Sequence, residues 1–152
     1  MAKSDPRPTD RNVLRPRTLY LLYITANSVR SELEQALRPF KLTGIQYSVL
    51  SMVDENDPMS SAEIARRFYV TPQTMNETII SLERRDLLAR VPDPANMRVR
   101  LVVLGDAGRT LLEECAPLVD RIETDAFSML GDEDLTTLRR LVLEVWQSRH
   151  ES

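Results

Sequence analysis

The fold is decided by residues 60–91, which read SSAEIARRFYVTPQTMNETIISLERRDLLARV. Ser60 and Glu63 have the spacing of a capping box, in which each side chain binds a free backbone N–H, so a short helix begins here. Thr71 followed by Pro72 starts a second helix, because Thr can cap free N–H groups and Pro has no N–H to lose. A short helix, a tight turn and a second helix form a helix-turn-helix.

A β-hairpin is predicted directly after the second helix. Residues 87–91 are expected to form one short strand, residues 92–97 a turn, and residues 98–104 a second strand. Alternation along the second strand separates arginines from aliphatic residues, with Arg98 and Arg100 on one face and Val99, Leu101 and Val103 on the other. A hairpin in this position is the wing of a winged helix-turn-helix domain.

Amphipathic helices are predicted on both sides of this core. Apolar side chains recur at three- and four-residue steps over residues 17–40, which is typical of a helix of about six turns, with a break near Pro39. Thr43 and Gln46 form a further capping box, which opens a short helix whose predicted apolar side carries Ile45, Val49, Leu50 and Val53.

Two more helices are predicted in the C-terminal part. Asp106 is expected to cap the first, which contains Pro117 and an apolar face with Cys115. Gly131 separates it from a last helix with a near-heptad apolar stripe of Leu135, Leu138, Leu141, Val142, Val145 and Trp146. Because Glu113 and Glu114 oppose thiolate formation, an inert core thiol is predicted at Cys115 rather than a redox sensor.

These elements predict a mainly α fold with a small β-hairpin wing. We expect a flexible basic arm at residues 1–16, a helical dimerisation region at residues 17–42 and 106–149, and a winged helix-turn-helix DNA-binding domain at residues 43–105. The apolar stripes of the first and last helices exceed what a small winged core can cover. They predict a two-fold homodimer, and closure of the stripes within one chain is the alternative.

The composition argues against several classes of protein. Among 152 residues there are one cysteine and one histidine, Cys115 and His150, too few for an internal disulfide or a structural zinc site. No apolar run approaches the ~20 residues of a membrane span, and the first residues lack a signal-peptide core, so we expect a cytoplasmic protein without a membrane partner. We find no nucleophile–base pair, phosphate loop or metal set, and expect neither an enzyme nor a cofactor.

The net charge of -3 conceals an uneven distribution. Residues 60–104 hold seven arginines against five acidic residues, whereas residues 105–152 hold five basic residues against eleven acidic ones. A nucleic-acid face depends on the local field rather than on the total charge. The winged segment is therefore the predicted nucleic-acid face.

The order of motifs from residue 42 to residue 112 points to one family. A capped helix with the sequence LTGIQYSVLSMV comes first, and a positioning helix that contains SAEIA follows it. A second helix ends in LERR. After it come a wing with Asp93-Pro94 and a glycine near the start of the next helix. In this order and spacing the chain resembles the MarR family of bacterial winged-helix transcriptional regulators. The flanking helices are similar to the dimerisation domain of that family.

This resemblance implies a transcriptional regulator that binds a pseudo-palindromic operator in double-stranded DNA as a homodimer, and we expect a repressor rather than an activator. It also implies release by a small aromatic or phenolic ligand, bound between the dimer helices and the winged domain. The polar-tipped candidates to line that pocket are Tyr20, Tyr23, Asn27 and Tyr47. Most of them could equally be core residues with satisfied hydroxyl groups, and for each residue taken alone this alternative is favoured.

DNA contacts are predicted in three groups. Base reading is assigned to the first turns of the recognition helix, at Gln73, Thr74 and Asn76, since Gln and Asn amides can pair with adenine through a donor and an acceptor. Phosphate contacts are assigned to Ser61, Arg66, Arg67, Thr71 and Arg84, and Arg85 and Arg90 can add charge. Minor-groove contacts are assigned to the wing, at Arg98 and Arg100.

Some positions depart from the pattern that the resemblance implies. Asp86 replaces a glycine, Asn96-Met97 replaces an Asp-containing pair before Arg98, Glu77 stands where a basic residue is common, and Gly105 replaces a threonine. Each change reduces positive charge or rigidity at the DNA face. The alternative function is therefore a winged-helix protein-interaction module with weak or no DNA binding.

Overall fold

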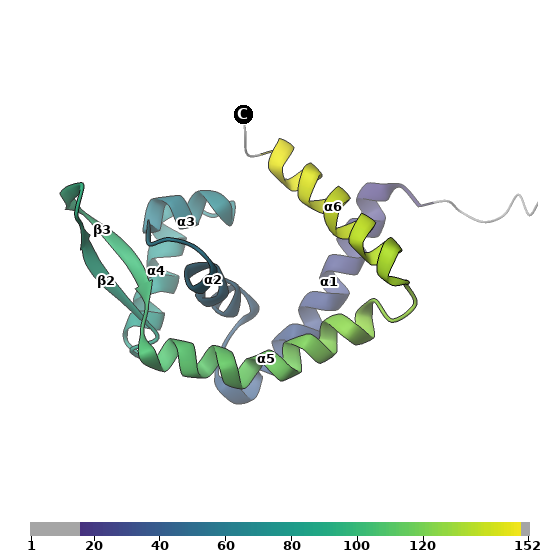
Figure 1. Cartoon of the computed structure of the whole chain (residues 1–152), viewed down its shortest axis with the longest axis horizontal. Coiled ribbons are helices and arrows are strands. Elements are labelled where there is room, and N and C mark those ends of the chain that lie inside the picture. Colours follow the sequence, from purple (N-terminus) through teal and green to yellow (C-terminus); the bar gives the residue numbers. More distant parts are fainter. Residues whose placement is uncertain (1–15, 150–152) are drawn as a thin grey trace, which may run out of the picture.

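The chain folds into six α-helices, one short 3-10 helix and a three-stranded sheet in a computed structural model that describes residues 16–149 (Figure 1). In chain order the elements are α1 (Thr18–Leu37), η1 (Arg38–Phe40), α2 (Gly44–Glu55), β1 (Met59–Ser60), α3 (Ser61–Arg67), α4 (Pro72–Glu83), β2 (Leu88–Asp93), β3 (Asn96–Leu104), α5 (Asp106–Ala126) and α6 (Asp132–Ser148). The mainly α winged-helix prediction is confirmed. Most of the predicted basic arm, residues 1–15, and His150 lie outside the described residues.

Two helices begin at the predicted capping boxes. At α2, Thr43 Oγ1 accepts from the Gln46 backbone N–H at 3.3 Å, and Gln46 Oε1 accepts from the Thr43 N–H at 3.0 Å. At α3, Ser60 and Glu63 make the same reciprocal pair, at 3.3 and 2.7 Å. The hydrogen bond from the Ser60 backbone lowers the pKa of Glu63 below its ordinary value of 4.5, and the Ser60 hydroxyl adds to this effect.

The start of α5 differs from the prediction. Asp106 is the first residue of the helix, and Gly105 takes the cap position without a side-chain hydrogen bond. A Cβ on Gly105 would lie 2.4 Å from the Asp86 carbonyl oxygen, and one on Gly108 would lie 2.2 Å from that of Leu87. The helix therefore starts in backbone contact with the turn that follows α4, and the Gly105 N–H donates to the Leu87 carbonyl at 3.0 Å.

The sheet has the strand order β1-β3-β2, with both pairs antiparallel. The strand β1 was not predicted; it is two residues long and pairs Met59 with Val102. The predicted turn over residues 92–97 is too long, because β2 continues to Asp93 and β3 begins at Asn96. The Asp93 side chain accepts from the Ala95 N–H at 2.8 Å, which satisfies a backbone donor within the short turn.

The hydrophobic core lies within the winged domain and includes Leu37 at the end of α1 and Cys115 near the middle of α5. Its fully buried large side chains are Leu37, Val49, Leu50, Ile64, Met75, Ile79, Leu82, Val102 and Cys115. Val102 belongs to the same alternating set as Arg98 and Arg100, so the arginine face of β3 becomes a core face toward the end of the strand. Ile45, predicted on the buried side of α2, is exposed because it lies in the first turn, beside a cavity next to α1.

The long helices extend away from this core. Figure 1 shows the wing at one end of the molecule, α1 and α6 at the other, and α5 running between the two parts. The helix α6 has no buried residue in the isolated chain, although it carries the predicted apolar stripe. Between residues 16 and 149, no helix is both long enough and apolar enough to cross a membrane.

Candidate nucleic-acid interface

The orientation of α4 determines which side chains can meet a ligand. Its apolar residues Met75, Ile79 and Leu82 are fully buried against the core. Because an α-helix turns by about 100° per residue, the opposite face carries Gln73, Glu77 and Arg84, and all three are exposed. Glu77, one of the departures from the family pattern, thus lies at the centre of the outward face.

The N-terminus of α4 is capped as predicted. Thr71 Oγ1 accepts from the Thr74 backbone N–H at 3.1 Å, and the hydroxyl groups of the two threonines lie 2.8 Å apart. Pro72 occupies the first turn, where its missing N–H costs nothing. Both threonines are exposed at the positive end of the helix dipole, which is the end that favours phosphate.

The third predicted base-reading residue, Asn76, is held by the wing. Arg90 on β2 donates from Nη2 to Asn76 Oδ1 at 2.7 Å and from Nε to Glu83 Oε1 at 3.0 Å. Arginine can only donate, so the atom of Asn76 that faces it is the oxygen and the NH₂ group points elsewhere. Arg90 is thus engaged within the protein, and Asn76 already uses the acceptor that an adenine contact through two bonds requires.

The arginines proposed for phosphate contact divide into two groups. Arg66 and Arg84 are exposed and have no ion-pair partner among the described residues, while the exposed Arg67 donates to Asn56 Oδ1 at 3.1 Å. Arg85 instead binds the junction between α1 and α2, donating to the carbonyl oxygens of Lys41 at 2.7 Å and of Phe40 at 3.0 Å. Ser61, the remaining phosphate candidate, is half-buried in the first turn of α3.

The turn between α3 and α4 contains a residue that no sequence motif singles out. Tyr69 has a φ of 53°, in the left-handed region that non-glycine residues rarely adopt, and its side chain is exposed. The next residue, Val70, donates from its backbone N–H to the Ala65 carbonyl at 3.2 Å, which closes the turn. This backbone conformation sets the angle at which α4 leaves α3.

The wing presents both predicted arginines to solvent. Arg98 and Arg100 are exposed and form no ion pair within residues 16–149. The Asn96 side chain accepts from the Arg98 backbone N–H at 3.2 Å, so it binds the backbone at the start of β3 rather than the Arg98 guanidinium. Met97, at the tip, is 71% exposed.

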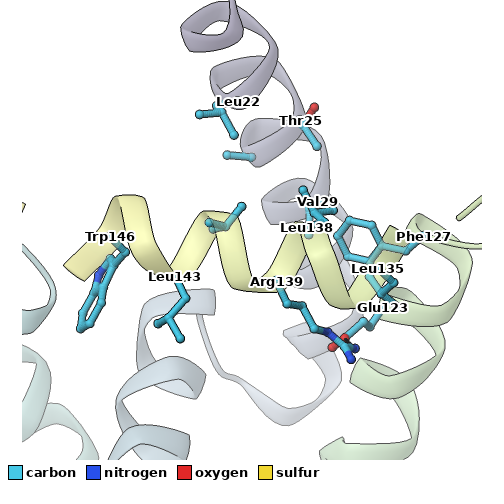
Figure 2. Close-up of a pocket in the computed structure, with 12 residues that line it drawn as sticks. Leu22, Thr25, Val29, Glu123, Phe127, Leu135, Leu138, Arg139, Leu143 and Trp146 are labelled. Carbon is cyan, nitrogen blue, oxygen red and sulfur yellow. Dashed lines mark hydrogen bonds and ion pairs between the residues drawn. The ribbon is translucent and has the colours of Figure 1, made fainter. Parts of the chain in front are cut away.

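Three cavities lie beside the helices, and none of their lining residues belongs to α4, β2 or β3. A cavity of about 690 Å³ lies between α1, α5 and α6. Figure 2 shows Val29, Leu138 and Phe127 close together where these helices meet. At its edge the guanidinium of Arg139 pairs with the Glu123 carboxylate. The walls of this cavity are almost entirely apolar.

Two further cavities lie on either side of the α2–α3 region and share Ser48 and Phe68. The first, of about 570 Å³, includes Tyr47 and Arg67, and the second, of about 640 Å³, lies against α1 and includes Arg30. Of the predicted pocket residues only Tyr47 lines one of the three cavities. The others lie on α1: Tyr20 and Tyr23 are 56% and 67% exposed, and Asn27 is half-buried.

The single cysteine is a core residue, as predicted. Cys115 is fully buried, and burial raises the pKa of its thiol, with a further contribution from the charge of Glu114. The protonated thiol is a poor nucleophile. Among residues 16–149, no three His, Cys, Asp or Glu side chains are grouped so as to hold a metal ion.

Comparisons with known proteins place this geometry among winged-helix regulators. A family model described as MarR family matches residues 40–98. The HTH-type transcriptional repressor Rv2887 of Mycobacterium tuberculosis is 30% identical over 123 residues, which cover 81% of this chain and 88% of that protein. Its structure in complex with salicylic acid aligns at 28% identity with a TM-score of 0.68, covering 86% and 96% of the two chains.

Two other solved structures share the fold at lower identity. CouR from Rhodococcus jostii RHA1, bound to p-coumaroyl-CoA, aligns with a TM-score of 0.80 at 24% identity and covers 89% of this chain and 95% of its own. A cysteine-to-serine mutant of MarR from E. coli, in complex with operator DNA, aligns with a TM-score of 0.73 at 22% identity. The alignment covers 83% of this chain and 91% of the MarR chain. At these identities the likeness establishes the fold.

Proposed function

Since this chain belongs to the MarR family of transcriptional regulators, we propose that it represses transcription by binding a pseudo-palindromic operator as a homodimer and is released by a small aromatic acid. The observation that carries the proposal is the outward face of α4, where Gln73 is exposed near the capped N-terminus and Arg84 is exposed at the C-terminal end of the helix. An exposed helix of this kind fits the major groove, and the arginines of the wing can reach the backbone or the minor groove.

The homodimer is supported by apolar surface on the long helices. A single chain exposes large side chains on α1 and α6, namely Leu19, Tyr20, Leu21, Leu22, Tyr23, Ile24, Leu141, Val142, Leu143, Val145 and Trp146. Soluble monomers rarely expose a contiguous apolar patch of this extent, and a second copy would cover it. The cavity between α1 and α6 is where side chains of the partner would enter. Two recognition helices would then face successive major grooves.

The proposed effector site lies beside α2. Rv2887 binds salicylic acid and CouR binds p-coumaroyl-CoA, so aromatic acids and their thioesters are the ligand class to test. Tyr47 supplies a hydroxyl to its cavity and Arg67 a guanidinium that can pair with a carboxylate. Tyr20, Tyr23 and Asn27 stay candidates, because their positions on α1 leave them available at the dimer interface. A ligand regulates only if it binds the two dimer states with different affinity.

The test of DNA binding is a titration of the full chain with DNA from upstream regions, at several salt concentrations. Affinity for one site that falls steeply with salt, and a mass of two chains by light scattering, are the expected results. Salicylate added to the complex should then weaken binding. Absence of DNA affinity even at low salt would overturn the proposal and favour the protein-interaction module.

That second candidate rests on specific observations. Glu77 places a negative charge at the centre of the outward face of α4, and Met97 places an apolar side chain at the tip of the wing. Both are unusual for a surface that approaches phosphates. The salt titration separates the two functions, because counterion release on DNA binding gives a steep salt dependence.

A further inference from the structure

Glu77 is the central residue of the face that α4 presents outward. Its neighbours two positions away on either side, Met75 and Ile79, are fully buried, so the Glu77 side chain points away from the core. Gln73 lies about one helical turn before it on the same face, and Arg84 lies about two turns after it. Any duplex that receives α4 in its major groove therefore meets the Glu77 carboxylate.

No basic side chain between residues 16 and 149 forms an ion pair with this carboxylate. Its hydrogen-bond partner within the same residues is the Gln73 amide, which donates from Nε2 to Oε1 at 3.3 Å. The arginine on the adjacent wing strand, Arg90, is occupied by Glu83 and Asn76. The Gln73 bond engages Oε1, so Oε2 stays available to an external donor.

The chemistry of base edges limits what such a carboxylate can meet favourably. The polar atoms that guanine and thymine present in the major groove are all acceptors, which repel a carboxylate, and the thymine methyl group offers no hydrogen bond. Adenine presents an amino group beside the N7 acceptor, whereas cytosine presents an amino group with no acceptor of its own on that edge. A carboxylate that the duplex encloses without a hydrogen-bond donor would carry an unpaired charge. Cytosine supplies a donor without an adjacent acceptor, so it is the base that Glu77 fits.

We propose that Glu77 determines operator specificity by accepting a hydrogen bond from the amino group of a cytosine at one position in each half-site. This inference rests on the proposed DNA-binding function and deepens it. It assigns a role in recognition to the one acidic residue of the outward face, and it explains how a negative charge is accommodated at the DNA interface.

The test is selection of binding sites from random double-stranded DNA by the full chain, its Glu77→Gln variant and a Glu113→Gln control. Gln keeps the size of the side chain but adds a donor, and Glu113 is an exposed glutamate on α5, outside the interface. We expect the natural chain to prefer cytosine by about tenfold at one half-site position. In Glu77→Gln this preference should disappear or move to adenine while other positions keep theirs, and Glu113→Gln should select the original site.

The outcomes separate the two proposals. Sites that contain no cytosine-selecting position, or an identical preference in the Glu77→Gln variant, would overturn the role of Glu77 and leave DNA binding in place. The same loss of preference in Glu113→Gln would also overturn it, because net charge rather than position would then be the cause. No enriched sequence with the natural chain would overturn DNA recognition altogether.

Discussion

Arg90 and Asn76 are joined by a hydrogen bond of 2.7 Å that links the wing strand β2 to the recognition helix α4. The same guanidinium binds Glu83, so one side chain contacts α4 at two points along its length. This arrangement fixes the angle of the helix relative to the wing and determines which group of Asn76 faces outward. The wing and α4 are therefore linked by side-chain hydrogen bonds at two points.

Arg90→Ala should destabilise the fold more than the removal of a solvated wing arginine. It leaves the Asn76 oxygen and the Glu83 carboxylate without their partner, and we expect a loss of about 1 kcal/mol in the free energy of unfolding, since the pair is only partly exposed. Urea denaturation measures this loss. Arg100→Ala on β3 is the matched control, and equal losses in the two variants would contradict a structural role for Arg90.

Arg98→Ala should weaken operator binding and flatten its salt dependence. Each phosphate charge neutralised by a protein cation adds about 0.9 to the slope of log affinity against log salt, so loss of one contact reduces the slope by about that amount. Fluorescence anisotropy at several salt concentrations gives the slope. Arg121→Ala removes an exposed arginine from α5 as a control. An unchanged slope in Arg98→Ala would remove Arg98 from the interface.

Val145→Glu should separate the proposed dimer without unfolding the chain. Val145 is 56% exposed in the single chain, so a carboxylate there is hydrated in the monomer but would be buried in a dimer built on α6. Light scattering should show a mass of one chain at micromolar concentration. Gln147→Glu, on the polar face of the same helix, should keep the mass of two. A dimeric Val145→Glu protein would place the interface elsewhere.

The capping box of α3 should make stability depend on pH in the acidic range. The pKa of Glu63 is lowered in the folded chain, so its carboxylate favours folding above the ordinary value of 4.5, and this contribution is lost as the pH falls through the folded pKa. Gln can also cap the helix but does not titrate. The natural chain should exceed Glu63→Gln in stability at neutral pH, and chemical denaturation should show the difference shrinking below pH 4.5. A constant difference would contradict the assignment.

Local features of the fold could be predicted because they depend on residues close in sequence. The capping boxes at Thr43 and Ser60 and the Thr71-Pro72 start of α4 require only side chains three residues apart or adjacent. The buried positions of α4 follow from its helical period. The helical period of the apolar residues around Cys115 likewise predicts that this residue lies in the core.

Features that depend on distant parts of the chain could not be predicted. The strand β1 exists because Met59 pairs with Val102. A strand of two residues is too short to show an alternating pattern from which it could be predicted. Arg85 binds carbonyl groups more than forty positions earlier, which is a backbone contact without any sequence signature. Of the candidate interface, sequence located the helix and the wing but could not tell that Arg90 is engaged with Asn76.

The glycine contacts at the start of α5 have a mechanical consequence. Because the backbone of Gly105 and Gly108 touches the turn after α4 so closely that no side chain fits, α5 cannot rotate at its root without carrying that turn with it. The helix α5 therefore connects the turn that follows α4 at one end with α6 at the other (Figure 1). In the proposed dimer, a displacement at the α1–α6 end would be transmitted along α5 to α4, and Gly108→Ala would disrupt the contact with the Leu87 carbonyl oxygen on which this coupling depends.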